Sequence, residues 1–178
     1  MLAEETVGWS YHRDLDLTGF IDGTENPSVA VAPSTVTVAD GAPGAGGSVL
    51  LLQKWRHQAA AWTRLPVSDQ ERVIGRTKPD SVELEDRPTT AHAARTDQDE
   101  FGHIFRRNTP YGSVLEHGTM FVGFAAARRP LHAMLQSMAG VTGERDALTH
   151  YSQPLTGAYY FVPSLDDLLD AADSESST

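Results

Sequence analysis

The sequence predicts an α+β domain in which helices flank an antiparallel sheet. Short, dense apolar runs at 48–55, 119–127 and 158–162 predict buried strands. Segments with helical spacing of apolar residues, or with helix-start signals, lie between and after these runs. A chain of 178 residues with 40% hydrophobic residues is long enough to bury one core without disulfides.

The N-terminal part of the chain is dominated by loop chemistry. Residues 1–18 are polar and form a lead-in, and 19–27 hold the glycine, Asp, Asn and Pro residues of turns. We expect 28–47, rich in Pro, Gly, Ala, Val and Thr, to form a mobile surface loop. The first strand, 48–55, follows, and 59–65 is expected to be helical.

The middle of the chain has one clear helix signal and one long irregular stretch. Ser68-Asp69-Gln70-Glu71 is a capping box, because the Ser hydroxyl and the Glu carboxylate can satisfy free amides of a first helical turn. A short helix to about Ile74 should follow. Residues 76–103 are polar, charged and without clear periodicity, which is typical of a functional or disordered segment.

The C-terminal part returns to regular structure. After the strand at 119–127, Pro130 suits the first turn of a helix that runs to about Ala139. Its apolar stripe is expected to join the core and consists of Leu131, Met134, Leu135 and Met138. The third strand, 158–162, is stopped by Pro163.

A last helix is expected at 165–171. We expect one domain over 1–170, followed by a disordered acidic, serine-rich tail at 171–178.

Composition excludes several classes of function. The absence of cysteine removes disulfides, thiolate metal sites and cysteine nucleophiles, and fits a reducing compartment. A net charge of −10 repels phosphate backbones, so we expect no nucleic-acid partner. No stretch approaches the roughly 20 apolar residues of a membrane span. Residues 1–11 lack the basic and apolar regions of a signal peptide. We therefore expect no membrane association and a cytoplasmic location.

Residues suited to chemistry occur at Asp22, His92 and Arg106-Arg107. Asp22 precedes Gly23, where the backbone can pass close to a ligand, although such an aspartate is also a common turn former. His92 lies among small residues that leave room for a large planar cofactor, whereas a lone histidine is more often structural. If Arg106-Arg107 lies in a strand, one guanidinium points inward and needs a carboxylate or an anionic ligand. From the residues alone, a chemical role and a purely structural role both stay open for each of them.

Taken together and in order, these motifs resemble the dye-decolourising peroxidase family. The matching pieces are Gly19-x-x-Asp22-Gly23, His92, Arg106-x-Asn108 followed by Pro110-Tyr111-Gly112, the strand 120–124, and 159–164. The resemblance runs from about Trp9 to Leu168 and covers the C-terminal, haem-binding half of the family. Because family members contain two related ferredoxin-like halves, it implies a ferredoxin-like domain of the dimeric α+β barrel type.

The resemblance implies a haem b enzyme that reduces hydrogen peroxide and oxidises dyes, phenolics or other small organic donors. His92 would be the proximal ligand of the iron, oriented by Asp146. On the distal side Asp22 would move a proton between the peroxide oxygens as general base and then acid. Arg106 would stabilise the charge that develops, and Asn108 would order water or peroxide.

The resemblance also implies further contacts with the cofactor. Phe121 and Phe124 are expected to face one side and wall the haem, and Arg95 and Arg107 are candidate partners of its propionates. The alternatives are a non-enzymatic haem-binding or haem-handling domain and a half-enzyme that needs a separate N-terminal half. An exposed apolar sheet face invites association, so we expect a homo-oligomer, at least a dimer, that pairs through its sheets.

Overall fold

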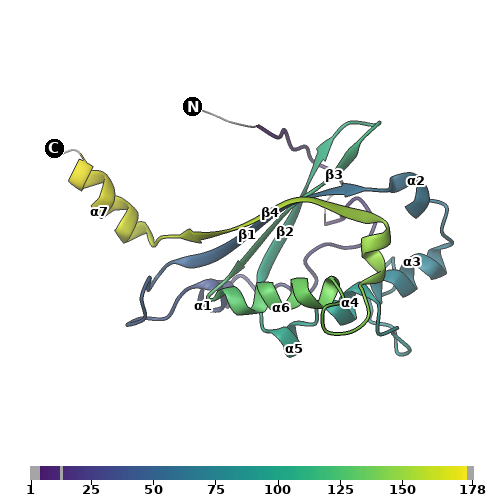
Figure 1. Cartoon of the computed structure of the whole chain (residues 1–178), viewed down its shortest axis with the longest axis horizontal. Coiled ribbons are helices and arrows are strands. Elements are labelled where there is room, and N and C mark those ends of the chain that lie inside the picture. Colours follow the sequence, from purple (N-terminus) through teal and green to yellow (C-terminus); the bar gives the residue numbers. More distant parts are fainter. Residues whose placement is uncertain (1–4, 13, 176–178) are drawn as a thin grey trace.

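An antiparallel sheet with helices on one side organises the computed structural model, which describes residues 5–12 and 14–175 (Figure 1). The strands of this part are β1 (Ser48–His57), β2 (Phe105–Gly112), β3 (His117–Ala125) and β4 (Ser152–Val162), in the order β2-β3-β1-β4. Helices follow β1, and another joins β3 to β4, so the chain has the β-α-β-β-α-β order of a ferredoxin-like fold. The predicted α+β, ferredoxin-like class is confirmed.

The helices are mostly short. They are α1 (Ala32–Val36), α2 (Ala59–Trp62), α3 (Val67–Ile74), α4 (His92–Arg95), α5 (Gln98–Phe101), α6 (Arg128–Met138), the 3-10 helix η1 (Ala147–His150) and α7 (Leu165–Glu175). Figure 1 shows α6 lying beside the sheet, with α4 and α5 near it and α7 projecting away from the body. No helix of the described part is both long and apolar enough to cross a bilayer.

The inner face of the sheet is the face that the helices cover. Side chains alternate between the faces of a strand. The inner face carries Leu51, Gln53 and Trp55 of β1, Arg106 and Asn108 of β2, and Thr119, Phe121 and Gly123 of β3. At one end of this face α6 contributes Leu131 and Met134 to a core with Leu51, Ile104 and Ala125. Farther along, Phe20, Trp62 and Ile74 form a second core cluster.

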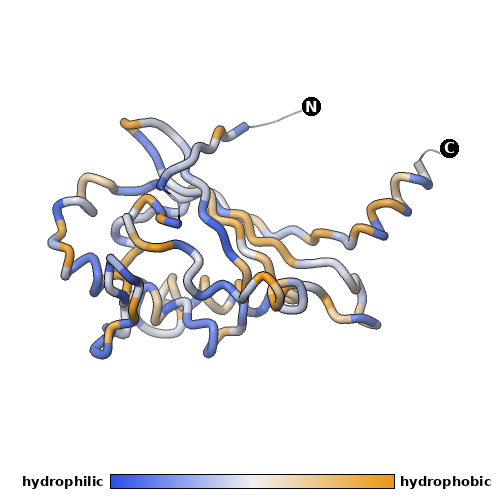
Figure 2. The backbone as a smooth tube through the Cα atoms, turned by 180° about the vertical axis from the view of Figure 1, so that it is seen from behind, coloured by the Kyte–Doolittle hydropathy of each residue, from blue (hydrophilic) through white to orange (hydrophobic). Residues whose placement is uncertain are grey.

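The outer face of the sheet is rich in apolar side chains. It carries Leu50, Leu52, Arg107, Val122 and Phe124. Tyr160 of β4 lies opposite Leu50 and is 51% exposed. Seen from behind, hydrophobic residues follow the strands and continue onto the projecting α7 (Figure 2).

The predicted strands are confirmed, with β3 ending at Ala125 rather than at 127 and β4 beginning as early as Ser152. β4 accommodates Pro154 at a register shift on the edge of the sheet, where a missing N–H costs no ladder bond. The capping box is wrong. Because α3 begins at Val67 with Pro66 as N-cap, Ser68 lies inside the first turn, and Glu71 instead accepts a bond from the backbone N–H of Lys78.

The other helix boundaries also differ from the sequence prediction. α2 ends at Trp62, and α6 begins at Arg128, so that Pro130 is its third residue. The irregular stretch 76–103 contains α4 and α5, and the loop 28–47 contains α1, whereas its mobility stays a prediction. The tail predicted to be disordered from 171 continues α7 to Glu175, and 176–178 lie outside the described residues.

Candidate active site

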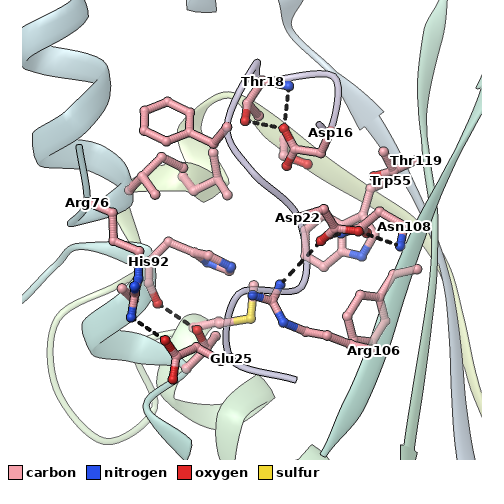
Figure 3. Close-up of a pocket in the computed structure, with 18 of the residues that line it drawn as sticks. Asp16, Thr18, Asp22, Glu25, Trp55, Arg76, His92, Arg106, Asn108 and Thr119 are labelled. Atoms are coloured by element: carbon pink, nitrogen blue, oxygen red, sulfur yellow. Dashed lines mark hydrogen bonds and ion pairs between the residues drawn. The ribbon is translucent and has the colours of Figure 1, made fainter. Parts of the chain in front are cut away.

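A cavity lies between the inner face of the sheet and the helices. Members of both core clusters line it, among them Leu51, Leu131 and Met134 from one and Trp62 and Ile74 from the other. Polar side chains enter this apolar space from two opposite walls (Figure 3). We call these the histidine wall and the aspartate wall.

The histidine wall is built from His92 and Asp146. His92 is the first residue of α4, directly after the fully buried Ala91. Its Nδ1 lies 2.7 Å from Oδ2 of Asp146, a side chain with 0% exposure. The other oxygen of Asp146 accepts a 2.8 Å bond from the N–H of Leu148 and so caps η1. Because the carboxylate takes the proton-bearing Nδ1, the lone pair on Nε2 of His92 is left for a ligand in the cavity.

The aspartate wall is built from Asp22, Arg106 and Asn108. The Asp22 carboxylate accepts one bond from the backbone N–H of Asn108 (3.2 Å) and one from its Nδ2 (3.0 Å). Nη1 of Arg106 lies 4.0 Å from Oδ1 of Asp22, and the two side chains are 21% and 9% exposed. Arg106 and Asn108 are two positions apart on β2 and therefore share a face, which is the inner face that lines the cavity.

The loop that carries Asp22 is fixed by local backbone geometry. Gly19 and Gly23 have φ values of 83° and 75°, which favour glycine, and they turn the chain on either side of Asp22. A bridge between Leu15 and Ile21 closes the first turn. The indole N–H of Trp62 donates a 3.0 Å bond to the carbonyl of Thr18 and holds the loop against the second core cluster.

Asp16 is a second carboxyl group that lines the cavity. Its Oδ1 accepts bonds from the N–H (2.7 Å) and the hydroxyl of Thr18. Burial raises the pKa of Asp16 above its usual value, against the lowering effect of the Thr18 bonds, and the charge of Asp22 adds a smaller increase. Asp16 was not predicted from the sequence, where it carries only the signal of a turn residue.

His57, the last residue of β1, also lines the cavity and was not predicted from the sequence. Its Nε2 is 3.2 Å from the hydroxyl of Thr119. Burial lowers the pKa of His57 from 6.5 to about 4, with a smaller contribution from the charge of His117. His57 is therefore neutral at pH 7.

The structure brings together most of the residues singled out from the sequence. Those that line the cavity are Asp22, His92, Arg106, Asn108 and Phe121, with Asp146 directly behind His92. The expectation that Phe121 and Phe124 share a face is wrong, because residues three apart on a strand point to opposite sides.

The two arginines suggested as cofactor contacts lie elsewhere. Arg107 is exposed on the outer face, away from the cavity. Arg95 is not among the described residues that line the cavity, and its guanidinium lies beside Gly143.

Charged residues before His92 form a network that the sequence analysis did not resolve. Arg76 is paired with Glu25, lies 3.5 Å from Glu83, and donates a 2.9 Å bond to the carbonyl of Ser81. Its side chain is 15% exposed and lines the cavity. The only sequence signal was the charged character of 76–103, because the pairing with Glu25 depends on the fold.

The donor set fits a planar, largely apolar group that contains a metal. One wall offers an imidazole nitrogen, the opposite wall offers a carboxylate, a guanidinium and an amide, and apolar side chains lie between them. Imidazole is a common ligand of iron, and the acid–base groups are separate from it. The cavity can therefore hold a cofactor on one side and position a small polar reactant on the other.

Comparison with known proteins gives consistent matches. Residues 13–167 match the family profile described as Dyp-type peroxidase, C-terminal. A dye-decolorizing peroxidase of Rhodococcus erythropolis is 40% identical over 182 residues, covering 96% of this chain and 53% of the relative. The dye-decolorizing protein from V. cholerae has a TM-score of 0.88 at 43% identity, covering 96% of this chain and 59% of that one.

A variant of DypB from Rhodococcus jostii, solved in complex with heme, has a TM-score of 0.85 at 37% identity. The match covers 94% of this chain and 58% of that one. The chain spans about half the length of the curated relatives it matches.

Proposed function

The chain belongs to the Dyp-type peroxidase family, and we propose that it is a haem b-dependent peroxidase that reduces hydrogen peroxide and oxidises dyes, phenolics or similar small donors. One observation carries the proposal: His92 with Asp146 faces Asp22 with Arg106 and Asn108 across a single apolar cavity (Figure 3). This arrangement separates a metal ligand from an acid–base pair.

On the histidine wall, Nε2 of His92 would ligate the iron. When bound, the haem supplies the redox chemistry that cleaves the O–O bond of peroxide. The 2.7 Å bond to Asp146 fixes the tautomer and the ring orientation of His92 and raises its basicity as a ligand. Phe121 would contribute to the apolar wall on the sheet side.

On the aspartate wall, the Asp22 carboxylate would take a proton from one peroxide oxygen and deliver it to the other. Its two bonds from Asn108 hold it on the cavity side of β2. Arg106 would stabilise negative charge as the O–O bond breaks, a role for which a preorganised cation in a dry site is effective. The amide of Asn108 would help to order the peroxide.

For the carboxylates of the cofactor, we propose Arg76 in place of Arg95 and Arg107. Arg76 lines the cavity and is mostly buried, so a charge-assisted bond to an anionic group there is only weakly screened by solvent. Its present partners, Glu25 and Glu83, are about half exposed and remain able to turn toward water.

We also propose that the chain forms a homo-oligomer, at least a dimer, in the cytoplasm. The apolar outer face, with Leu50, Leu52, Val122 and Phe124, supports pairing through the sheets. The acidic, cysteine-free composition supports a reducing compartment. Sedimentation equilibrium tests the assembly, and a stable monomer at all concentrations contradicts it.

The experiment that tests the function is a haem titration of the purified chain followed by one equivalent of peroxide. A Soret band that changes with peroxide and returns when a phenolic donor is added supports a peroxidase. A band that only bleaches favours a haem-binding or haem-handling domain. Failure to take up stoichiometric haem favours a half-enzyme that needs a separate partner half.

A further inference from the structure

The free edge of β2 is closed by residues that do not belong to a strand. β2 is the first strand of the sheet, with β3 on one side only. In an antiparallel pair, every second residue turns its N–H and C=O away from the neighbour. On β2 these residues are Arg106, Asn108 and Pro110. Both backbone groups of Arg106 bond to Asn26, the N–H of Asn108 donates to Asp22, and the carbonyl of Pro110 accepts from the N–H of Trp9.

The bond pattern of Asn26 is the one that a neighbouring strand would make. Its Nδ2 donates a 2.8 Å bond to the carbonyl of Arg106, and its Oδ1 accepts a 2.9 Å bond from the N–H of Arg106. The two residues are 80 positions apart in the sequence. One carboxamide thus satisfies both backbone groups of Arg106, the residue that carries the guanidinium of the aspartate wall.

We propose that Asn26 is a positioning residue for the pair formed by Asp22 and Arg106. It clamps the main chain of Arg106, while Asp22, on the same loop, holds Asn108. The loop therefore sets the 4.0 Å separation between Asp22 and Arg106 through two docking points on one edge. The role in peroxide chemistry rests on the function proposed above, whereas the clamp itself does not.

The geometry makes this role specific to Asn26. Removing its carboxamide leaves the N–H and the carbonyl of Arg106 without their partner, which frees the main chain from which the guanidinium extends. Gln98 offers a matched comparison. Its amide donates a 3.0 Å bond to the carbonyl of Glu25 and accepts a 2.9 Å bond from the N–H of Ile104, so it ties the same loop to the residue before β2 without bonding to Arg106.

The first test is amide hydrogen exchange in the chain without haem. Asn26→Ala should speed exchange at the Arg106 amide by about tenfold, the equivalent of one to two lost hydrogen bonds. The Arg107 amide, which faces β3, should keep its rate, and Gln98→Ala should leave Arg106 protected. Unchanged protection at Arg106 in Asn26→Ala overturns the proposal. If Asn26→Ala does not fold, Asn26→Ser replaces it in both tests.

The second test is a double-mutant cycle on the rate of the peroxide reaction in the haem-loaded chain. Asn26→Ala should slow the reaction about tenfold in the parent and by clearly less in the Arg106→Leu background, because most of its effect passes through the position of Arg106 relative to Asp22. Gln98→Ala should act by the same factor in both backgrounds. Equal slowing by Asn26→Ala in both backgrounds overturns the positioning role. If the chain shows no peroxide chemistry, the proposed function fails, and the exchange result decides the clamp.

Discussion

The two walls of the cavity are held in different ways. On the histidine wall, His92 and Asp146 are 2.7 Å apart, and Asp146 is fully buried and bonded again to the N–H of Leu148. On the aspartate wall, Arg106 and Asp22 are 4.0 Å apart, on an edge strand and a loop joined through side chains. The histidine wall is fixed by burial, whereas the aspartate wall depends on the docking of the loop that carries Asp22 onto β2. Haem affinity and the rate of the peroxide reaction should therefore respond separately to mutation.

Removing the proposed iron ligand is the strongest test of the difference between the two walls. We expect His92→Ala to lower haem affinity by more than about a hundredfold, since loss of an orienting partner alone costs about 10–100-fold. Absorption titration at the Soret band measures it, with the exposed His150→Ala as the control. Unchanged haem affinity in His92→Ala would place the ligand elsewhere.

On the aspartate wall, mutation should lower the rate of the peroxide reaction and have little effect on haem affinity. Arg106→Leu is expected to slow the reaction with peroxide by about a hundredfold to a thousandfold, because a preorganised charge stabiliser is lost. Haem affinity should stay close to that of the parent. Stopped-flow absorption gives both quantities, and Asp22→Asn should behave similarly. A parent-like rate in Arg106→Leu would contradict the distal assignment.

A subtler change tests how firmly the histidine wall is fixed. Asp146→Asn keeps the volume of the side chain and removes the charge that faces Nδ1 of His92. We expect haem affinity to fall about tenfold, at the lower end of the effects of such orienting partners. The peroxide rate of the haem-loaded fraction should change less than in Arg106→Leu. A larger rate effect than affinity effect would mean that the two walls are coupled.

A separate expected effect concerns stability and involves His57, which lines the same cavity. The pKa of His57 is about 4 in the folded chain and 6.5 in its ordinary state, so the unfolded chain binds the extra proton between these values. The stability that His57 contributes is present above pH 6.5 and is lost as the pH falls toward 4. Asp16, whose pKa is raised, acts in the opposite direction, because its protonation favours the folded state.

Comparison with His57→Gln isolates this contribution. Between pH 7.5 and 5.0 we expect the parent to lose about 2 kcal/mol more of its free energy of unfolding than His57→Gln loses. Urea unfolding followed by tryptophan fluorescence measures both proteins. Parallel losses in the two proteins would show that His57 does not titrate in this way.

The sequence predicted β1, β3 and the C-terminal part of β4, because each is a dense apolar run. It did not predict β2, whose sequence is mixed, and by strand alternation it separated Arg106 from Arg107 only on the condition that they lie in a strand. The same rule was misapplied to Phe121 and Phe124, which are three residues apart and point to opposite faces. The capping box failed because the N-cap of α3 is Pro66, two positions before the Ser68 N-cap that the motif suggests.

The rest of the site depends on contacts between distant segments, which local patterns do not encode. Asn26 belongs to a turn motif, and only the fold brings its amide to Arg106. In the sequence Arg76 is one of many charged residues, and its pairing with Glu25 follows only from the fold. The perturbed pKa values of Asp16 and His57 follow from burial, which the polarity of these residues would not suggest.

The docking of the loop on β2 has a consequence for solubility. An uncovered edge strand offers free N–H and C=O groups that can pair with another chain and seed aggregation. Here Asn26, Asp22 and the backbone of Trp9 bond to most of those groups, and Pro110 has no N–H to offer. The segment that carries Asp22 thus also shields the β2 edge of the sheet from intermolecular β-pairing. Variants that loosen it should aggregate sooner on heating than variants of equal stability elsewhere in the fold.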